Sequence, residues 1–134
     1  MSGLMIGDIA VQRIIEEEVP FFIPHETFVE ATPEALAPHR HWLEPNAMDP
    51  ETGMLILPFQ SYLVRTKHHT ILIDTCIGCG KSITHRPQWF QRTDQTWLNN
   101  LRAAGLQPEA IDYVFCTHLH ADHCGWNTTF VDGR

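Results

Sequence analysis

Three of the nine histidines in this 134-residue chain lie within residues 118–123, in the stretch THLHADHCGW. His118 and His120 are two apart, and Asp122 and His123 follow directly. Residues two apart on a strand point to the same side, so a strand ending here would present both imidazoles to one metal ion. Asp122 and His123, where the chain must turn, diverge from that pair and could reach a second ion beside the first. The spacing predicts a paired metal site suited to hydrolysis.

The alternative interpretation of this stretch is a histidine-rich surface loop or a set of core histidines. An apolar run, YVFC, leads directly into the histidines, which favours ligands fixed to the end of a strand. Gly125 permits a tight backbone path after them, and an acidic Asp122 near a helix start is favoured by the helix dipole. These features together favour the metal site.

Other residues that could do chemistry have weaker contexts. Cys76 and Cys79 form C-x-x-C, which could be redox-active or half of a zinc site. Cys116 and Cys124 are spaced differently and supply no second pair, so we expect loop and core thiols. Cys116 is expected in the core and Cys124 beside the ligands. The remaining candidates are expected to be lid residues (His39, His41), a solvated turn (His68, His69) and an exposed acidic strand end (Glu16, Glu17, Glu18).

Alternating hydrophobic and turn residues indicate the elements that must position the histidines. One strand is predicted at Met5–Ile15. Two more flank a turn at KHH, and a helix capped by Thr93 or Asp94 ends at Gly105. A final strand leads into the histidines. The strands after the first are predicted at Met54–Thr66, Thr70–Thr75 and Asp112–His120, and the helix at Thr93–Leu106.

The region from Glu16 to Gly53 is crowded with prolines and aromatic residues. Prolines interrupt regular elements, so we expect no long one here and only a short helix near Pro33–Ala37. Burial of the region's large aromatic side chains is favourable, which argues against disorder. We therefore expect a lid or pocket wall. The prolines are Pro20, Pro24, Pro33, Pro38, Pro45 and Pro50, and the aromatic residues are Phe21, Phe22, Phe28 and Trp42.

Composition limits the classes of function. The length suits a single domain, residues 1–134, and the formal net charge of −7 with no Lys/Arg cluster disfavours a nucleic-acid partner. No apolar run approaches the roughly 18 residues of a membrane span, and the N-terminus does not read as a signal peptide. We therefore expect a cytoplasmic protein with reduced thiols and a small-molecule substrate.

The stretch HLHADH matches the His-x-His-x-Asp-His signature of the metallo-β-lactamase superfamily. The sequence especially resembles the branch with lactonases and methyl-parathion-hydrolase-like enzymes in the pattern IDTCIGCGK…W…L…AAGLQPEAIDYVFCTHLHADHCGWN. The resemblance covers the chain from about Met54 onward, and more weakly the first strand. It implies an α+β fold, the αβ/βα sandwich of that family, of which this chain supplies roughly the N-terminal αβ half.

The resemblance also implies roles for individual residues. His118 and His120 would bind the first metal, and Asp122 and His123 the second, with zinc the expected metal and other divalent ions possible. Asp122 would also manage the proton of the attacking water. Asp74, at the end of ILID, would lie beneath the metal loop and orient it, which requires Thr70–Asp74 and Tyr113–Thr117 to be neighbouring buried strands. The implied activity is hydrolysis of an ester, lactone or phosphoester by water activated between two metals.

The family completes its site with downstream ligands that this chain does not match. After His123 the only further acidic or histidine side chain is Asp132. We therefore expect a truncated domain that binds metal weakly, turns over little substrate by itself, and pairs with a missing C-terminal half or self-associates. The alternatives are a non-catalytic metal- or partner-binding fragment of the fold, and a nuclease of the same superfamily.

Overall fold

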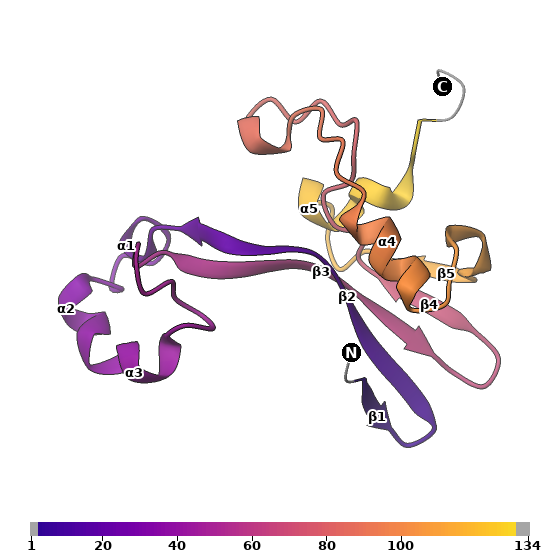
Figure 1. Cartoon of the computed structure of the whole chain (residues 1–134), viewed down its shortest axis with the longest axis horizontal. Coiled ribbons are helices and arrows are strands. Elements are labelled where there is room, and N and C mark those ends of the chain that lie inside the picture. The colour runs from indigo at the N-terminus through magenta and orange to yellow at the C-terminus, as the bar shows by residue number, and fades with distance from the viewer. Residues whose placement is uncertain (1–2, 131–134) are drawn as a thin grey trace. The chain divides into compact units, whose positions relative to one another are not determined.

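The computed structural model describes residues 3–130, and Asp132 lies outside them. The chain divides into two compact units, one formed by Met1–Glu17 with Phe59–Arg134 and the other by Glu18–Pro58. Within the described residues, five strands form one sheet in the order β1-β2-β3-β4-β5 (Figure 1). The strands β2 and β3 contribute residues to both units.

The elements have the following bounds. The strands are β1 (Leu4–Ile6), β2 (Ile9–Phe22), β3 (Leu55–Arg65), β4 (Thr70–Ile73) and β5 (Tyr113–Phe115). The helices are α1 (Pro24–Thr27), α2 (Pro33–Leu36), α3 (Arg40–Leu43), α4 (Thr96–Ala103) and α5 (Ala121–Cys124). Single 3-10 turns are η1 (Ala37–His39), η2 (Pro87–Trp89), η3 (Pro108–Ala110) and η4 (Gly125–Asn127).

The single N-terminal strand predicted from the sequence is wrong, because two antiparallel strands replace it. β1 pairs with β2 in the register Leu4↔Val11 and Ile6↔Ile9. The connection is a two-residue turn that begins with Gly7 at φ +59°, a conformation that glycine adopts without a Cβ clash. The Gly7–Asp8 pair is therefore a hairpin signal that the apolar run around it concealed.

The strand β2 continues through Pro20 to Phe22, although the proline was expected to forbid a long element. Proline cannot donate to a ladder and is tolerated where one side of a strand is unpaired. The pairing of β1 with β2 covers only residues 9–11 of β2, which leaves that side of the later residues without β1. Pro20 is exposed there, so the proline ends no element.

The strands that lead to the histidines follow the prediction in order and pairing. β3 and β4 form an antiparallel hairpin around the KHH turn, with Arg65 opposite Thr70. β4 and β5 are parallel neighbours, with Ile73 opposite Phe115. The expected burial of β5 is wrong: Phe115 is 61% exposed, since β5 is the last strand of the described sheet.

One cluster of apolar side chains joins the sheet to α4. Trp97 and Leu101 of α4 are buried in it, and the indole of Trp97 stacks on that of Trp126 with ring centroids 5.4 Å apart. Fully burying each large apolar side chain contributes about 1.5–3 kcal/mol. The helix stops where predicted, with Gly105 at φ +80°, and Asp94 accepts a hydrogen bond from the Thr96 N–H at its start. The other buried members are Ile14, Leu63, Leu72 and Cys76.

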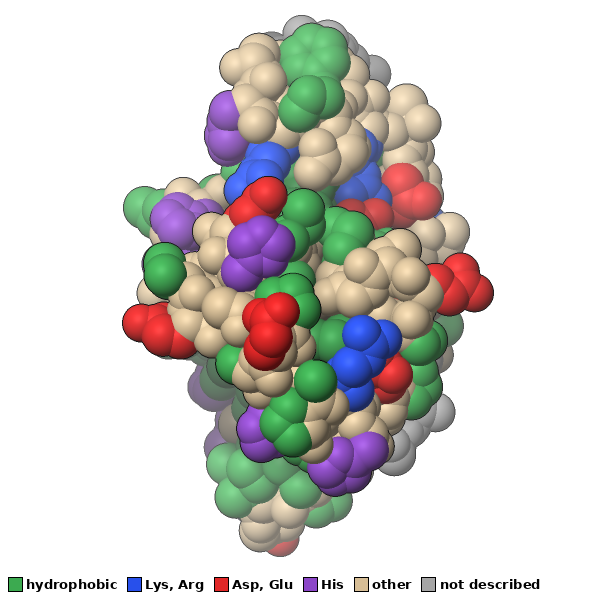
Figure 2. All heavy atoms as spheres, turned by 90° about the vertical axis from the view of Figure 1, so that its left-hand side faces the viewer, with side chains coloured by type: hydrophobic (Ala, Val, Ile, Leu, Met, Phe, Trp, Pro, Cys, Tyr) green, Lys and Arg blue, Asp and Glu red, His purple; other side chains and the backbone are tan. Residues whose placement is uncertain are grey.

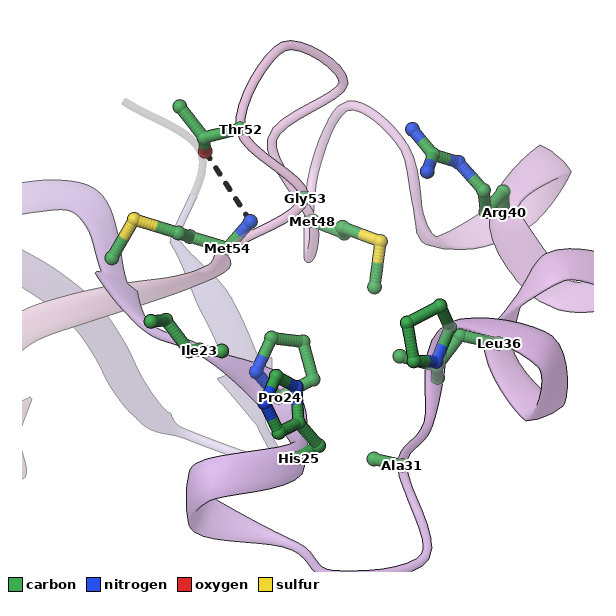
Figure 3. Close-up of a pocket in the computed structure, with 11 residues that line it drawn as sticks. Ile23, Pro24, His25, Ala31, Leu36, Arg40, Met48, Thr52, Gly53 and Met54 are labelled. Atoms are coloured by element: carbon green, nitrogen blue, oxygen red, sulfur yellow. Dashed lines mark hydrogen bonds between the residues drawn. The ribbon is translucent and has the colours of Figure 1, made fainter.

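The second unit, Glu18–Pro58, contains the short helices α1 to α3, and α2 confirms the helix expected near Pro33. Its aromatic side chains are less buried than expected: Phe28 is 58% and Trp42 60% exposed. Met48 is buried beside a cavity of about 250 Å³ that Ile23, Leu36 and other apolar side chains line (Figure 3). The role of this region as a lid stays a prediction.

The surface carries mixed side chains. On the face shown in Figure 2, acidic, basic and histidine side chains are interspersed with hydrophobic ones, and Lys and Arg form no extended patch there. Among residues 3–130, none of the helices combines the length and apolar character needed to cross a bilayer.

Candidate metal centre

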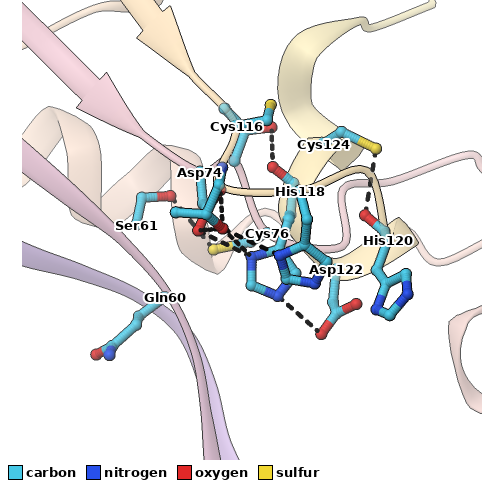
Figure 4. Close-up of polar contacts among 12 residues, drawn as sticks. Gln60, Ser61, Asp74, Cys76, Cys116, His118, His120, Asp122 and Cys124 are labelled. Carbon is cyan, nitrogen blue, oxygen red and sulfur yellow. Dashed lines mark hydrogen bonds and ion pairs between the residues drawn. The ribbon is translucent and has the colours of Figure 1, made fainter.

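Asp74 follows β4 directly and reaches the loop that carries the histidines (Figure 4). Its carboxylate accepts hydrogen bonds from the Thr117 N–H at 2.7 Å and the Thr117 hydroxyl at 2.9 Å, and its Oδ2 lies 2.8 Å from Nδ1 of His123. Asp74 is 7% exposed and has φ +59°, an unusual backbone conformation for a residue with a Cβ. The predicted closeness of Asp74 to this loop is confirmed.

These contacts assign protons to the imidazoles. The carboxylate of Asp74 can only accept, so Nδ1 of His123 carries the proton between them. The Thr117 hydroxyl gives its one hydrogen to Asp74, and its lone pairs then face Nδ1 of His118 at 3.1 Å, which must carry a proton too. In both rings Nε2 remains as the basic nitrogen. A histidine whose other nitrogen is held in this way is oriented for metal binding.

The histidines come together through a loop and not through strand alternation. β5 ends at Phe115, so His118 and His120 lie beyond it, and His120 directly precedes α5. The strand predicted to extend to His120 is wrong, because Thr117 bonds to the side chain of Asp74 and not to a neighbouring strand. The ring centroids of His118 and His120 are 4.5 Å apart, and those of His118 and His123 are 3.8 Å apart.

Donor chemistry at this loop suits zinc in type, since zinc binds imidazole nitrogen and carboxylate oxygen. Nε2 of His123 lies 3.5 Å from Oδ2 of Asp122. Across residues 3–130, no three His, Cys, Asp or Glu side chains are grouped so as to hold one metal ion. The loop therefore fits zinc by donor type, and a bound ion would need further ligands besides a pair from this loop.

A buried segment, Asp74–Gly78, is hydrogen-bonded along its backbone to the loop that carries the histidines. We call this segment and residues 117–127 together the clamp. Thr75 N–H donates to the His123 carbonyl at 2.8 Å, and Trp126 N–H donates back to the Thr75 carbonyl at 2.9 Å. A Cβ added at Gly125 would lie 1.9 Å from the Ile77 carbonyl oxygen, far inside contact distance. The two backbones are in contact here, so position 125 has room only for a residue without a Cβ.

The surroundings shift the acidities of this segment. Burial of Asp74 opposes ionisation, but the hydrogen bonds from His123 and Thr117 outweigh it and lower the pKa of the carboxyl below 3.8. Burial raises the pKa of the Cys76 thiol, which makes it an unreactive neutral group beside Ser61. Asp74 therefore remains an anion that favours a protonated Nδ1 on His123.

All four cysteines are free thiols, as expected, and Cys76 with Cys79 form no disulfide. Cys116 is half-buried and not in the core as predicted, because β5 is exposed, and its sulfur accepts a hydrogen bond from Asn127. Cys124 donates to the carbonyl of His120, so it lies beside the ligands as expected.

The histidines outside this loop are exposed. His41 bonds through Nδ1 to the nearby Pro38 carbonyl at 3.0 Å, and His39 contacts the ring of Trp42. The turn residues His68 and His69 are exposed as predicted.

Sequence reasoning misplaced Glu16 and overlooked Thr117. Glu16 was expected at an exposed strand end, but it is 4% exposed because β2 continues past it and carries its side chain inward with Ile14. The two-residue spacing from Ile14 was the available signal. Thr117 precedes the first ligand directly, and only the position of Asp74 reveals its role.

Comparison with known families decides the relationship. The model of the metallo-beta-lactamase superfamily matches residues 58–133, more than half of the chain. The chain belongs to this superfamily. The match includes β4, the clamp and HLHADH, so the resemblance and the α+β fold inferred from the sequence are confirmed.

Relatives within this superfamily include lactonases. The chain is 32% identical over 90 residues to an N-acyl homoserine lactonase of Bacillus cereus, a match that covers 58% of this chain and 35% of that relative. The chain thus spans about a third of the length of this relative.

Solved structures share the fold over most of this chain. A probable metal-dependent hydrolase from Staphylococcus aureus aligns with a TM-score of 0.66 at 25% identity, covering 90% of this chain and 41% of that one. A dizinc quorum-quenching lactonase in complex with a product aligns with a TM-score of 0.64 at 22% identity, covering 92% and 37%. The described sheet and helices are thus the corresponding part of a larger sandwich in these hydrolases.

Proposed function

We propose that this chain carries one half of the active site of a two-zinc hydrolase that opens lactones. The observation that carries the proposal is the hydrogen-bond network in which one carboxylate, that of Asp74, orients the His118–His123 loop through Thr117 and His123. Such a network keeps one nitrogen of each imidazole protonated and leaves the other free to bind a metal ion.

In this proposal His118 and His120 hold one zinc ion, and Asp122 and His123 hold the other. Zinc, when bound, lowers the pKa of a coordinated water toward neutrality and polarises the oxygen of the scissile group. Asp122, half-buried beside His123, accepts the proton of the attacking water at its carboxylate and returns it to the leaving oxygen. Asp74 keeps the proton on Nδ1 of His123 throughout.

The substrate class is a small lactone, with esters and phosphoesters as the related classes to test. The lactonases of Bacillus support the lactone through their similarity over 90 residues. The mixed surface in Figure 2 and the net charge of −7 support a small neutral molecule over a nucleic acid.

Zinc titration of the 134-residue chain with a competing chromophoric chelator tests the metal site. We expect weak binding that His123→Ala and Asp122→Asn abolish and that His68→Ala, in the exposed β3–β4 turn, leaves unchanged. A panel of N-acyl homoserine lactones, aryl esters and phosphotriesters then tests the reaction class. Equal zinc binding by His68→Ala and His123→Ala would contradict the proposal.

The grouping of metal donors favours a second candidate, a domain of the same fold that binds metal or a partner without catalysis. It is favoured because no three-donor group occurs in residues 3–130. Zinc binding without turnover on any member of the panel, even with a supplied C-terminal half of a relative, would decide for it.

A further inference from the structure

Glu16 is a buried carboxylate that the proposed reaction does not use. It lies within β2 and is 4% exposed. Its two oxygens accept three hydrogen bonds, from the Ile77 N–H at 2.8 Å, the Gly78 N–H at 3.1 Å and Nε1–H of Trp126 at 2.7 Å. These donors are about 60 and 110 residues away in sequence, so the contact exists only in the folded chain.

The three donors belong to the two sides of the clamp. Ile77 and Gly78 are on the segment behind the metal loop, at the point where Gly78 and Gly125 touch. Trp126 follows His123 by three residues and begins the path away from the loop. One carboxylate thus bonds both sides at the place where their backbones meet.

A carboxylate is a costly residue to bury, and its hydrogen bonds do not fully offset that cost. Burial raises the pKa of Glu16, although its three hydrogen bonds and the charge of Arg92 oppose this rise. An apolar side chain would fill the same space without this penalty, but it would leave two backbone N–H groups and an indole N–H unpaired. A carboxylate at this position therefore satisfies all three N–H donors, and it can do so only while the two sides of the clamp stay together.

We propose that Glu16 is a positioning residue of the metal centre, which fixes the rear of the His118–His123 loop by holding Ile77, Gly78 and Trp126 together. The inference rests on the proposed function, since positioning matters where ligands must be held. Asp74 bonds to Thr117 and His123, at the two ends of the ligand stretch, and Glu16 bonds to Trp126, just after it. The ligands between them are then held at both ends.

Amide hydrogen exchange on the metal-free chain tests the positioning directly. Gly125 N–H bonds to the Cys76 carbonyl and Trp126 N–H to that of Thr75, so their exchange reports opening of the clamp. In Glu16→Gln we expect both amides to exchange at least tenfold faster while the amides of β3 and β4 keep their wild-type rates. Glu18→Gln, an exposed acid on the same strand, is the matched control and should change neither.

A double-mutant cycle identifies the bond to Trp126. Trp126→Phe keeps a ring for stacking but removes the indole donor. We expect Glu16→Gln to accelerate the exchange of Gly125 less in the Trp126→Phe background than in the wild type. Strictly additive effects, or acceleration spread evenly over the sheet, would overturn the positioning role and leave Glu16 as a stabilising residue alone.

Zinc affinity, measured by chelator competition well below the unfolding temperature, links positioning to the site. We expect about tenfold weaker binding for Glu16→Gln and wild-type binding for Glu18→Gln. If the wild type binds no zinc, the proposed function fails, and the exchange data still decide the role of Glu16. If the wild type and Glu16→Gln bind equally and exchange equally, the inference about Glu16 is wrong and the function stands.

Discussion

The clamp and the helical region from Pro24 to Leu43 are held together in different ways. In the clamp, side chains bond to partners more than 40 residues away, as Asp74 does to Thr117 and Glu16 to Trp126. In the helical region backbone hydrogen bonds join residues three or four apart, for example Phe28 N–H to the Pro24 carbonyl, and the side chain of Arg40 reaches only as far as the Pro50 carbonyl. Long-range bonds fix a geometry that the whole unit must maintain, whereas local bonds hold each turn separately.

This difference suits the role proposed for the clamp and the role predicted from the sequence for the helical region. Metal ligands must keep their positions to within fractions of an ångström, and a rigid scaffold provides this. A wall that admits a substrate benefits from short helices whose packing can adjust. The comparison predicts that substitutions in the clamp act on stability and metal binding, and that those in the helical region act on substrate selection.

The largest effect is expected from Gly125→Ala. The new Cβ would meet the Ile77 carbonyl at 1.9 Å, so the two backbones of the clamp must part. We expect a loss of about 3–5 kcal/mol in the free energy of unfolding, measured by urea denaturation. Gly53→Ala is the control in the second unit: nothing lies within 4 Å of its Cβ, and its φ of +69° costs about 1–2 kcal/mol. Equal losses in both variants would remove the contrast between the regions.

Next in size is Asp74→Asn. The lowered pKa of Asp74 means that its carboxylate stabilises the fold above pH 3.8 and that this contribution disappears as the pH falls through the folded-state pKa. We expect the variant to lose about 1.5–3 kcal/mol at pH 7, the range for hydrogen bonds to a charged group, and much less at the acid end. Urea denaturation across pH measures this, and a difference independent of pH would contradict it.

The carboxylate of Glu16 should show the opposite pH dependence. Its pKa is raised above 4.5 in the folded chain, so the folded state binds the proton more tightly and the wild type loses stability as the pH rises through that range. Glu16→Gln removes this dependence, so its disadvantage relative to the wild type should shrink as the pH rises. Unfolding curves of both proteins from pH 4 upward, spaced by about half a pH unit, measure this difference. A disadvantage of Glu16→Gln that grows with pH would contradict the prediction.

The smallest effect on stability is expected from Trp42→Ala. The side chain is 60% exposed and contacts His39 in its own helical turn. We expect a change within about 0.5 kcal/mol and unchanged zinc affinity. If the helical region forms a pocket wall, the variant should instead change the relative turnover of long-chain and short-chain lactones in a catalytically complete protein. A loss of stability comparable with that of Asp74→Asn would mean that the helical region is not adaptable.

Pattern reasoning succeeded at two turns: the hairpin at KHH and the end of α4 at Gly105 follow from turn residues and the apolar runs beside them. The apolar runs together with the family resemblance also predicted that β4 and β5 are neighbours. Pattern reasoning failed for Pro20, where the missing partner strand and not the proline decides whether β2 continues. It failed again for His118, because the end of β5 depends on the side chain of Asp74, which follows β4.

By itself, the sequence determined the superfamily and the identity of the candidate ligands, since HLHADH lies within six consecutive residues and its donor chemistry does not depend on the fold. Only the tertiary structure decided how those residues are held. Thr117 orients His118 because its hydroxyl donates a hydrogen bond to Asp74 and its oxygen then faces Nδ1 of His118. Glu16 is buried and fully bonded because β2 passes close to Ile77 and Trp126. Contacts between residues 43 to 110 positions apart depend on how distant parts of the chain come together, which no local pattern records.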